Sequence, residues 1–133
     1  MPKEVIIDNE NTALWYHTTK KIVHHVIHKP IFGKALQECL EKGIALLKKH
    51  NAKKWLSDYR KNGAMLKDDV DWIDNEWYPR AAMTDWKHWA IVLPEKTVGQ
   101  LSMNRIATIF AQPGFDIKTF TDPDEAMSWL IGI

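Results

Sequence analysis

The hydrophobic and polar residues of the chain follow two periodicities, and the first of them covers the opening 28 residues. Short runs rich in β-branched residues alternate there with clusters of turn-forming residues, which is typical of strands joined by tight turns. We expect strands at 4–7, 13–17 and 21–28, separated by turns at 8–11 and 18–20. Strands this close in sequence pair most simply as an antiparallel meander.

The pattern changes to a helical period at Pro30, a residue type that is tolerated in a first helical turn. Apolar residues then recur three or four positions apart and predict a helix that ends at His50-Asn51. Glycine has no side chain, so the position of Gly43 on the apolar stripe predicts a close approach between this helix and the sheet. The expected stripe consists of Phe32, Leu36, Cys39, Leu40, Gly43 and Leu47.

Three further strands are expected, at 53–57, 88–93 and 115–120. The middle one is apolar at every position from Trp89 onward, which is typical of a strand that is covered on both faces in a parallel sheet. In the last one, charged residues alternate with apolar residues. One of its faces is therefore expected to contact water, which favours a place near the edge of the sheet.

Three further helices alternate with these strands. The first is expected to be capped by Asp68 and to bend or end at Pro79, which lacks a backbone donor. The second begins at Thr97, which with Gln100 has the spacing of a capping box. The third begins with Asp122 as its cap, followed by a proline and two acidic residues. Their buried faces are expected to be Val70, Ile73, Trp77 and Ala81; Met103, Ile106, Ala107 and Phe110; and Ala126, Met127 and Leu130.

The order β-β-β-α-β-α-β-α-β-α predicts an α/β fold. Strands that alternate with helices are joined by crossover connections, which produce parallel pairing. We expect a mixed, mostly parallel sheet of five to six strands, flanked by four helices. A chain of 133 residues with this pattern is expected to form a single domain over residues 1–133.

Composition excludes few functions, but it argues against nucleic acid as a partner. The chain has 18 basic and 17 acidic residues and a formal charge of +1, whereas nucleic-acid binding needs a strongly basic face. The one local excess of positive charge is the lysine cluster at 48–54. We interpret it as a solvated helix end that suits the helix dipole, with a binding patch as the alternative.

The single cysteine, Cys39, cannot form an intramolecular disulfide, which suits a reducing cytoplasmic setting. It lies on an apolar helical stripe and is interpreted as a buried, inert thiol. No run of residues approaches the length of apolar sequence that spans a bilayer, and the first residues lack the apolar core of a signal peptide. We therefore expect a cytoplasmic protein.

Four segments of the second half of the chain carry a resemblance to a known family. They are KKWLSDYR (53–60), EWYPR (76–80), WKHWAIVLP (86–94) and FTDPDEAMSWL (120–130). Together with the order of elements, they resemble the STAS domain of bacterial anti-sigma-factor antagonists and, more closely, the SpoIIAA-like or STAS/SEC14-domain group of small bacterial proteins. The resemblance spans about the last 80 residues, and the first 50 agree only in pattern.

This resemblance implies either a switch-like role with a protein partner or a carrier of an apolar ligand. The antagonists are phosphorylated on a hydroxyl residue in an Asp-Ser-Ser/Thr-Gly motif at a helix start. Here the corresponding strand ends with Ser57 before Asp58, and a long loop precedes the next helix. The chain departs from the motif, so we do not expect a phosphorylation switch at Ser57.

Three histidines close in sequence, His24, His25 and His28, are candidate metal ligands. On a strand His24 and His25 point to opposite faces, and His24 and His28 share a face at a separation of about 13 Å, too far for one zinc ion. On a helix His24 and His28 would lie one turn apart and could chelate. The β-branched residues favour the strand, so we expect no metal site and, in the absence of a phosphate-binding loop, no cofactor.

The best candidate site lies outside the carboxyl ends of the parallel strands, where ligands gather in open α/β sheets. Some of the polar residues there also have structural interpretations. Asp122 could be a helix cap, and Asp58 could form a structural ion pair with Arg60. Alternatively, Arg60 could bind an anion. The candidate rim consists of Ser57, Asp58, Arg60, Glu95, Lys96 and Asp122.

These observations favour a non-enzymatic protein that binds another protein, because no catalytic constellation is found. One alternative is a SEC14-like carrier of a small apolar ligand or lipid, which needs a cavity of about 300–1,000 Å³. A second is an enzyme that uses the rim. Three tryptophans are the least easily placed in the core: Trp72, Trp86 and Trp129. They either cover the core or form a surface that binds a partner. A second copy of the chain could be that partner, so a homodimer is a further alternative.

Overall fold

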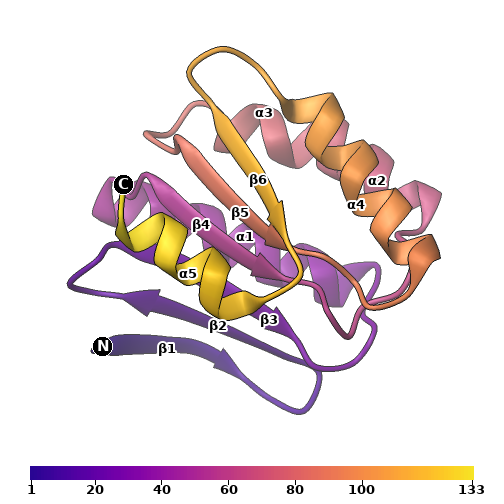
Figure 1. Cartoon of the computed structure of the whole chain (residues 1–133), viewed down its shortest axis with the longest axis horizontal. Helices are drawn as coiled ribbons and strands as arrows, with labels where there is room; N and C mark the ends of the chain where they lie inside the picture. The colour runs from indigo at the N-terminus through magenta and orange to yellow at the C-terminus, as the bar shows by residue number, and fades with distance from the viewer.

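The computed structural model describes the whole chain, residues 1–133, and its centre is one six-stranded sheet (Figure 1). The strands lie side by side in the order in which they occur in the chain. β1 to β3 pair as an antiparallel meander, and β3 to β6 pair in parallel. The fold is therefore α/β with a mixed, mostly parallel sheet, as the sequence predicted. The strands are β1 (Lys3–Asp8), β2 (Thr12–His17), β3 (Ile22–Ile27), β4 (Lys54–Asp58), β5 (His88–Val92) and β6 (Asp116–Phe120).

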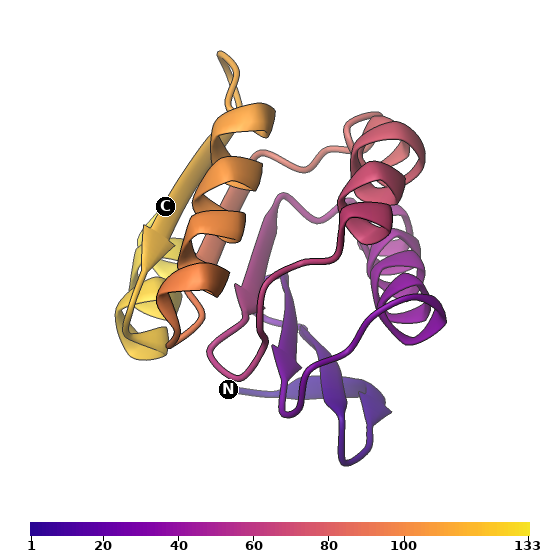
Figure 2. The same cartoon turned by 90° about the vertical axis from the view of Figure 1, so that its right-hand side faces the viewer.

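The helices cover the two faces of the sheet unequally. Those that connect the parallel strands all lie on one face, and the last helix lies alone on the other, against β4, β5 and β6 (Figures 1 and 2). The single-sided arrangement follows from the strand order, because crossovers of one hand that always step in the same direction return on the same face. The helical segments are α1 (Lys34–His50), α2 (Lys67–Trp72), the π-helical turn η1 (Ile73–Trp77), α3 (Tyr78–Ala81), α4 (Thr97–Phe110) and α5 (Pro123–Ile131).

The sheet separates two hydrophobic cores. The larger contains Trp89 and Ile91 of β5 and the buried faces of α1, η1, α3 and α4. The smaller contains Ala90 and Val92 of the same strand, together with α5. This alternation confirms the prediction that the central apolar strand is covered on both faces. β6 is the edge strand, also as predicted, and its side chains are exposed or half-buried.

Four tryptophans meet in the larger core. Trp55, Trp77, Trp86 and Trp89 are all buried, with the ring centroids of Trp55 and Trp86 5.3 Å apart. The sequence did not place Trp86 in the core, and the structure does. The close approach predicted at Gly43 is confirmed, since a β-carbon there would lie 2.0 Å from the Trp55 ring.

The start of α1 differs from the prediction. The helix begins at Lys34 rather than at Pro30, and Phe32 is 65% exposed instead of lying on the buried stripe. Gly33 accounts for the difference, because its positive φ of 59° turns the chain immediately before the first helical turn. Its backbone N–H donates to the buried carboxylate of Asp69, which fixes this turn against α2.

Of the other predicted helix starts, the one at Asp68 is wrong, because Leu66 precedes α2. α4 does begin at Thr97, but without the side-chain hydrogen bond of the predicted capping box. Asp122 does cap α5, where its carboxylate accepts a hydrogen bond of 2.8 Å from the N–H of Asp124. The helix also continues past Pro79, because η1 widens the preceding turn and makes room for the proline ring.

None of the helices is both long enough and apolar enough to cross a membrane.

Candidate functional site

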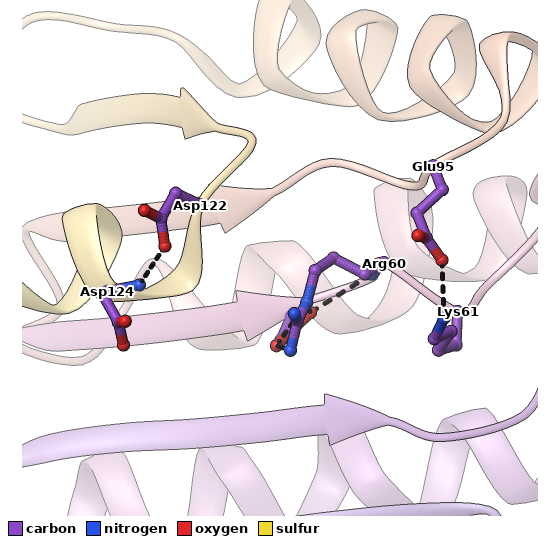
Figure 3. A network of polar contacts seen from close by, with 6 residues as sticks. Arg60, Lys61, Glu95, Asp122 and Asp124 are labelled. Carbon is purple, nitrogen blue, oxygen red and sulfur yellow. Dashed lines mark hydrogen bonds and ion pairs between the residues drawn. The ribbon is translucent and has the colours of Figure 1, made fainter.

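Two of the polar residues predicted at the carboxyl edge of the sheet, Asp58 and Arg60, form an ion pair with each other. Asp58 is buried at the end of β4, and the guanidinium of Arg60 folds back over it (Figure 3). Arg60 Nε lies 3.0 Å from Asp58 Oδ1, and Nη2 lies 2.9 Å from Oδ2. These charge-assisted hydrogen bonds raise the pKa of Arg60 and occupy the Nε–Nη2 edge of the guanidinium, which would otherwise bind an anion. The geometry is that of a structural ion pair.

Glu95 and Lys96 lie beyond this pair, in the loop after β5. Glu95 accepts a hydrogen bond of 2.8 Å from Lys61 Nζ, which lowers the pKa of the carboxyl group (Figure 3). A hollow of about 170 Å³ is present here, smaller than typical ligand pockets. Of the predicted rim, only Arg60, Glu95 and Lys96 line it. Asp122 lies at the start of α5, where it acts as the helix cap. The lining residues are Pro30, Arg60, Lys61, Asn62, Gly63, Glu95 and Lys96.

Ser57 does not belong to the rim, which corrects the sequence-based expectation. β4 extends to Asp58, so that Ser57 is an interior residue of the strand and its side chain points into the larger core. Its hydroxyl lies 2.6 Å from His25 Nε2 and accepts a hydrogen bond of 2.9 Å from Trp89 Nε1. The signal in the sequence was the period of two, which places Ser57 on the same face as Trp55.

The buried trio of His25, Ser57 and Trp89 resembles a base next to a nucleophile, but its environment gives it a structural role. Ser57 Oγ accepts a hydrogen bond from Trp89 Nε1 and lies within hydrogen-bond distance of His25 Nε2, whose other ring nitrogen, Nδ1, lies 3.7 Å from Cys39 Sγ. Burial lowers the pKa of His25 to about 4 and raises that of Cys39 to about 12. All four side chains are buried, and none lines a pocket described here.

The absence of a crevice at the carboxyl edge has a topological cause. Such crevices form where the strand order reverses and two neighbouring connections leave for opposite faces of the sheet. In this protein the order never reverses, and the connections after β3, β4 and β5 all go to the same face (Figure 2). The rule that predicted a rim site therefore does not apply to this sheet.

A cleft that the sequence did not reveal lies between α2 and α4. It has a volume of about 380 Å³. Met65, Val70 and Ile106 give it an apolar floor, and polar side chains surround its mouth. No periodicity could have indicated this cleft, because its two walls are about 35 residues apart in the chain. The lining residues are Met65, Lys67, Val70, Asp71, Ser102, Arg105 and Ile106.

Arg105 is the distinctive polar residue of the α2–α4 cleft. The chain has three arginines, and Arg60 and Arg80 each form an ion pair with a carboxylate, Asp58 and Glu41 respectively. Arg105 has no carboxylate within ion-pair distance and donates no hydrogen bond within the protein. The other cation at the mouth, Lys67, is paired with Asp71 at 2.7 Å.

The outer face of α4 continues the apolar character of the cleft. Val98, Leu101 and Ile109 are exposed there, with Leu101 at 65%. These residues and Arg105 recur at helical spacing, so that they share the side of α4 opposite to the buried Met103 and Phe110. The α2–α4 cleft therefore lies beside an exposed apolar face of α4, and Arg105, with its unpaired guanidinium, belongs to both.

The histidines do not form a metal centre. No group of three or more His, Cys, Asp or Glu side chains is placed to hold a metal ion. His17 and His24 meet across β2 and β3, with Nε2 and Nδ1 3.0 Å apart, and burial lowers the pKa of both imidazoles. Two neutral rings that share one hydrogen bond account for this arrangement.

Comparison of the chain with models of protein families, with curated proteins and with solved structures finds no match.

Proposed function

We propose that this protein is a non-enzymatic binding domain whose α2–α4 cleft receives a short amphipathic segment of a partner protein. Apolar side chains of the segment enter the cleft above Met65, Val70 and Ile106, and an acidic residue pairs with Arg105. The single observation that carries the proposal is the combination of this apolar cleft with an unpaired guanidinium at its mouth. Exposed apolar surface with a charged rim is typical of protein-binding sites.

The remaining polar groups support binding rather than catalysis. A general base or a nucleophile must reach a substrate, and the candidates in this chain are engaged elsewhere. Asp58 is covered by Arg60, Glu95 is paired with Lys61, and the His25–Ser57 pair is buried in the core. A binding role needs none of them to be free.

A regulatory role in the cytoplasm, as in the SpoIIAA-like and STAS group, is part of the same proposal. It is supported by the order of strands and helices, which is the order on which the resemblance rests. A switch by phosphorylation is not part of it. Ser57, the only serine or threonine near the corresponding strand end, is buried and hydrogen-bonded.

A second candidate occupant is a small apolar carboxylate, such as a fatty acid of medium chain length. The volume of the α2–α4 cleft, about 380 Å³, favours it, since ligand pockets begin at about 300 Å³. The alkyl chain would lie on the same apolar floor and the carboxylate would pair with Arg105. The two candidate occupants differ in the area of protein surface that they cover, because only a protein segment would also cover Leu101 on the outer face of α4.

The test places a photo-crosslinking residue at Leu101 and, as a matched control, at Ala45, which is exposed on α1. A captured segment is identified, synthesised as a peptide and titrated against the protein and the Arg105→Glu variant. We expect capture at Leu101 but not at Ala45, and at least roughly tenfold weaker peptide binding by the variant, as for a lost ion pair at an interface. Peptide affinity that is independent of Arg105 would contradict the proposal.

Native mass spectrometry of the purified protein decides between the two occupants. If the purified protein carries a small acid that the Arg105→Glu variant does not carry, and nothing is captured at Leu101, the occupant of the cleft is the carboxylate and not a protein segment. An empty protein that captures a segment at Leu101 favours the protein partner.

A further inference from the structure

A second polar hollow lies at the amino end of the parallel strands, on residues that the α2–α4 cleft does not use. It has a volume of about 270 Å³ and no hydrophobic lining residue. Three separate parts of the chain form it: the turn between β2 and β3, the end of α1 and the start of β4. The lining residues are Lys20, Lys21, Asn51, Lys53 and Lys54.

The four lysines of this basic hollow have no acidic partner. The lysines that form ion pairs in this protein are others, at positions 29, 42, 61 and 67. Lys54 donates hydrogen bonds to backbone oxygens of Leu130 and Ile133, at 2.6 and 2.9 Å. Its pKa is lowered by burial and by the nearby Lys20, so positive charges in the hollow repel one another.

The negative end of the α1 dipole explains only part of this charge. Lys48 and Lys49 lie in the last turn of α1, where cations are favourable. Lys20 and Lys21 come from a hairpin turn elsewhere in the chain and have no such role. The sequence showed the cluster at 48–54 alone, and the fold adds two further lysines to it.

The backbone is strained at two positions of the same hollow. Lys21 has a φ of 58° and Asn51 a φ of 49°, and they are the only two residues other than glycine with a positive φ. The left-handed region suits asparagine but disfavours a long side chain such as lysine. Glycine would relieve the strain at position 21, so a lysine there carries a conformational cost together with an unpaired charge.

We propose that this basic hollow binds a compact multivalent anion of the phosphate class. Phosphate oxygens accept hydrogen bonds from several ammonium groups at once and would relieve the repulsion between Lys20 and Lys54. The lining has no aromatic side chain on which a nucleotide base could stack, which favours a small group such as pyrophosphate or a phosphorylated lipid headgroup. The proposal is independent of the α2–α4 cleft, since the two sites share no residue.

Pyrophosphate is the probe, titrated by calorimetry into the full chain at two salt concentrations. The test variant is Lys20→Gln/Lys53→Gln, which leaves Lys54 and its hydrogen bonds to the end of α5 in place. The matched control is Lys29→Gln/Lys42→Gln, which removes the same charge from lysines that are paired with Glu10 and Glu38. We expect roughly tenfold weaker binding by the test variant and little change in the control, because only the former removes charges next to the anion.

Vesicles distinguish the two sources of the phosphate group. Binding to vesicles that contain a phosphorylated lipid, with displacement by pyrophosphate, assigns the hollow to a headgroup. Binding of pyrophosphate without binding to vesicles assigns it to a free anion. Equal weakening in the test and control variants, or no binding of either probe, would overturn the proposal.

Lys21→Gly separates binding from folding. Glycine relieves the positive φ and removes one repelling charge, so the urea midpoint of unfolding is expected to rise while affinity for pyrophosphate falls several-fold. A lysine that only supports the fold would give the opposite result for stability. A variant with a higher midpoint and unchanged affinity would also contradict the assignment of Lys21 to the site.

Discussion

Replacement of Gly43 by alanine is the sharpest test of how the helix layer packs on the sheet. A β-carbon at this position would lie 2.0 Å from Cη2 of Trp55, 2.7 Å from Cζ3 and 2.9 Å from Cζ2. Real β-carbons essentially never approach another heavy atom within 3.0 Å. The substitution therefore forces either α1 or the indole ring to move.

Neither partner can move freely. Trp55 is fully buried, and its ring centroid lies 5.5 Å from that of Trp77 and 5.3 Å from that of Trp86. Overpacking of such a core costs about 1–3 kcal/mol, and a contact this short places the cost near the upper value. Alanine in a helix interior is favoured over glycine by about 1 kcal/mol. The expected net loss in the free energy of unfolding is thus about 2 kcal/mol.

Urea unfolding followed by far-ultraviolet circular dichroism measures this loss without depending on tryptophan fluorescence. Ala45→Gly is the control, because Ala45 is exposed in the same helix and reports the helix propensity difference alone. Trp55→Phe replaces the bicyclic indole by a shorter phenyl ring, which lacks the atoms Cη2, Cζ2 and Cζ3 of the close contact. In a double-mutant cycle, Gly43→Ala should therefore cost at least about 1 kcal/mol less in the Trp55→Phe background.

A Gly43→Ala protein that is more stable than the parent, by the amount that Ala45→Gly loses, would refute the reasoning. It would mean that propensity alone decides the outcome and that the predicted contact with Trp55 is absent. Additive effects in the double-mutant cycle would lead to the same conclusion.

Three further outcomes are expected. Ser57→Ala should destabilise the protein by about 2–4 kcal/mol in urea unfolding, because it leaves two buried ring nitrogens without partners; a loss below about 1 kcal/mol would contradict the hydrogen bonds assigned here. The pKa of His24 is lowered from 6.5 to about 3 and that of His25 to about 4, so the unfolded chain binds more protons and stability should fall with pH from about 6.5 towards 4. His24→Gln should reduce that slope, and an unchanged slope would argue against a buried neutral imidazole. Asp122→Ala should cost about 1 kcal/mol as a lost helix cap, whereas Thr97→Ala should cost almost nothing because its side chain caps no helix; similar losses in the two variants would show that a capping box forms after all.

Much of the fold could be predicted because its signals are local. The strand at 88–93, the edge position of the last strand and the cap at Asp122 each follow from residues within a few positions of one another. The failures were local as well. Pro30 and Asp68 have the right chemistry for helix starts, but α1 begins only at Lys34, after the turn at Gly33, and the cap position of α2 is Leu66 rather than Asp68.

The candidate site was predicted only in part, for reasons that are not local. Arg60, Glu95 and Lys96 do meet at the carboxyl edge. Ser57 points into the core because it lies on the same face of β4 as Trp55, and it lies within the strand because β4 extends one residue further than expected at its carboxyl end. The rule of the ligand crevice depends on a reversal of strand order, which no single segment of the sequence encodes.

The sequence by itself determined which segments are strands and helices, that the central strand is buried on both faces, and that Gly43 meets the sheet. Periodicity, caps and residue size carry that information over short stretches of chain. Only the tertiary structure decided the order of the parallel strands, the α2–α4 cleft beside Arg105 and the gathering of Lys20 and Lys21 with Lys53 and Lys54. These features join residues that are about 30 or more positions apart, and their juxtaposition depends on strand register and on the face to which each helix returns.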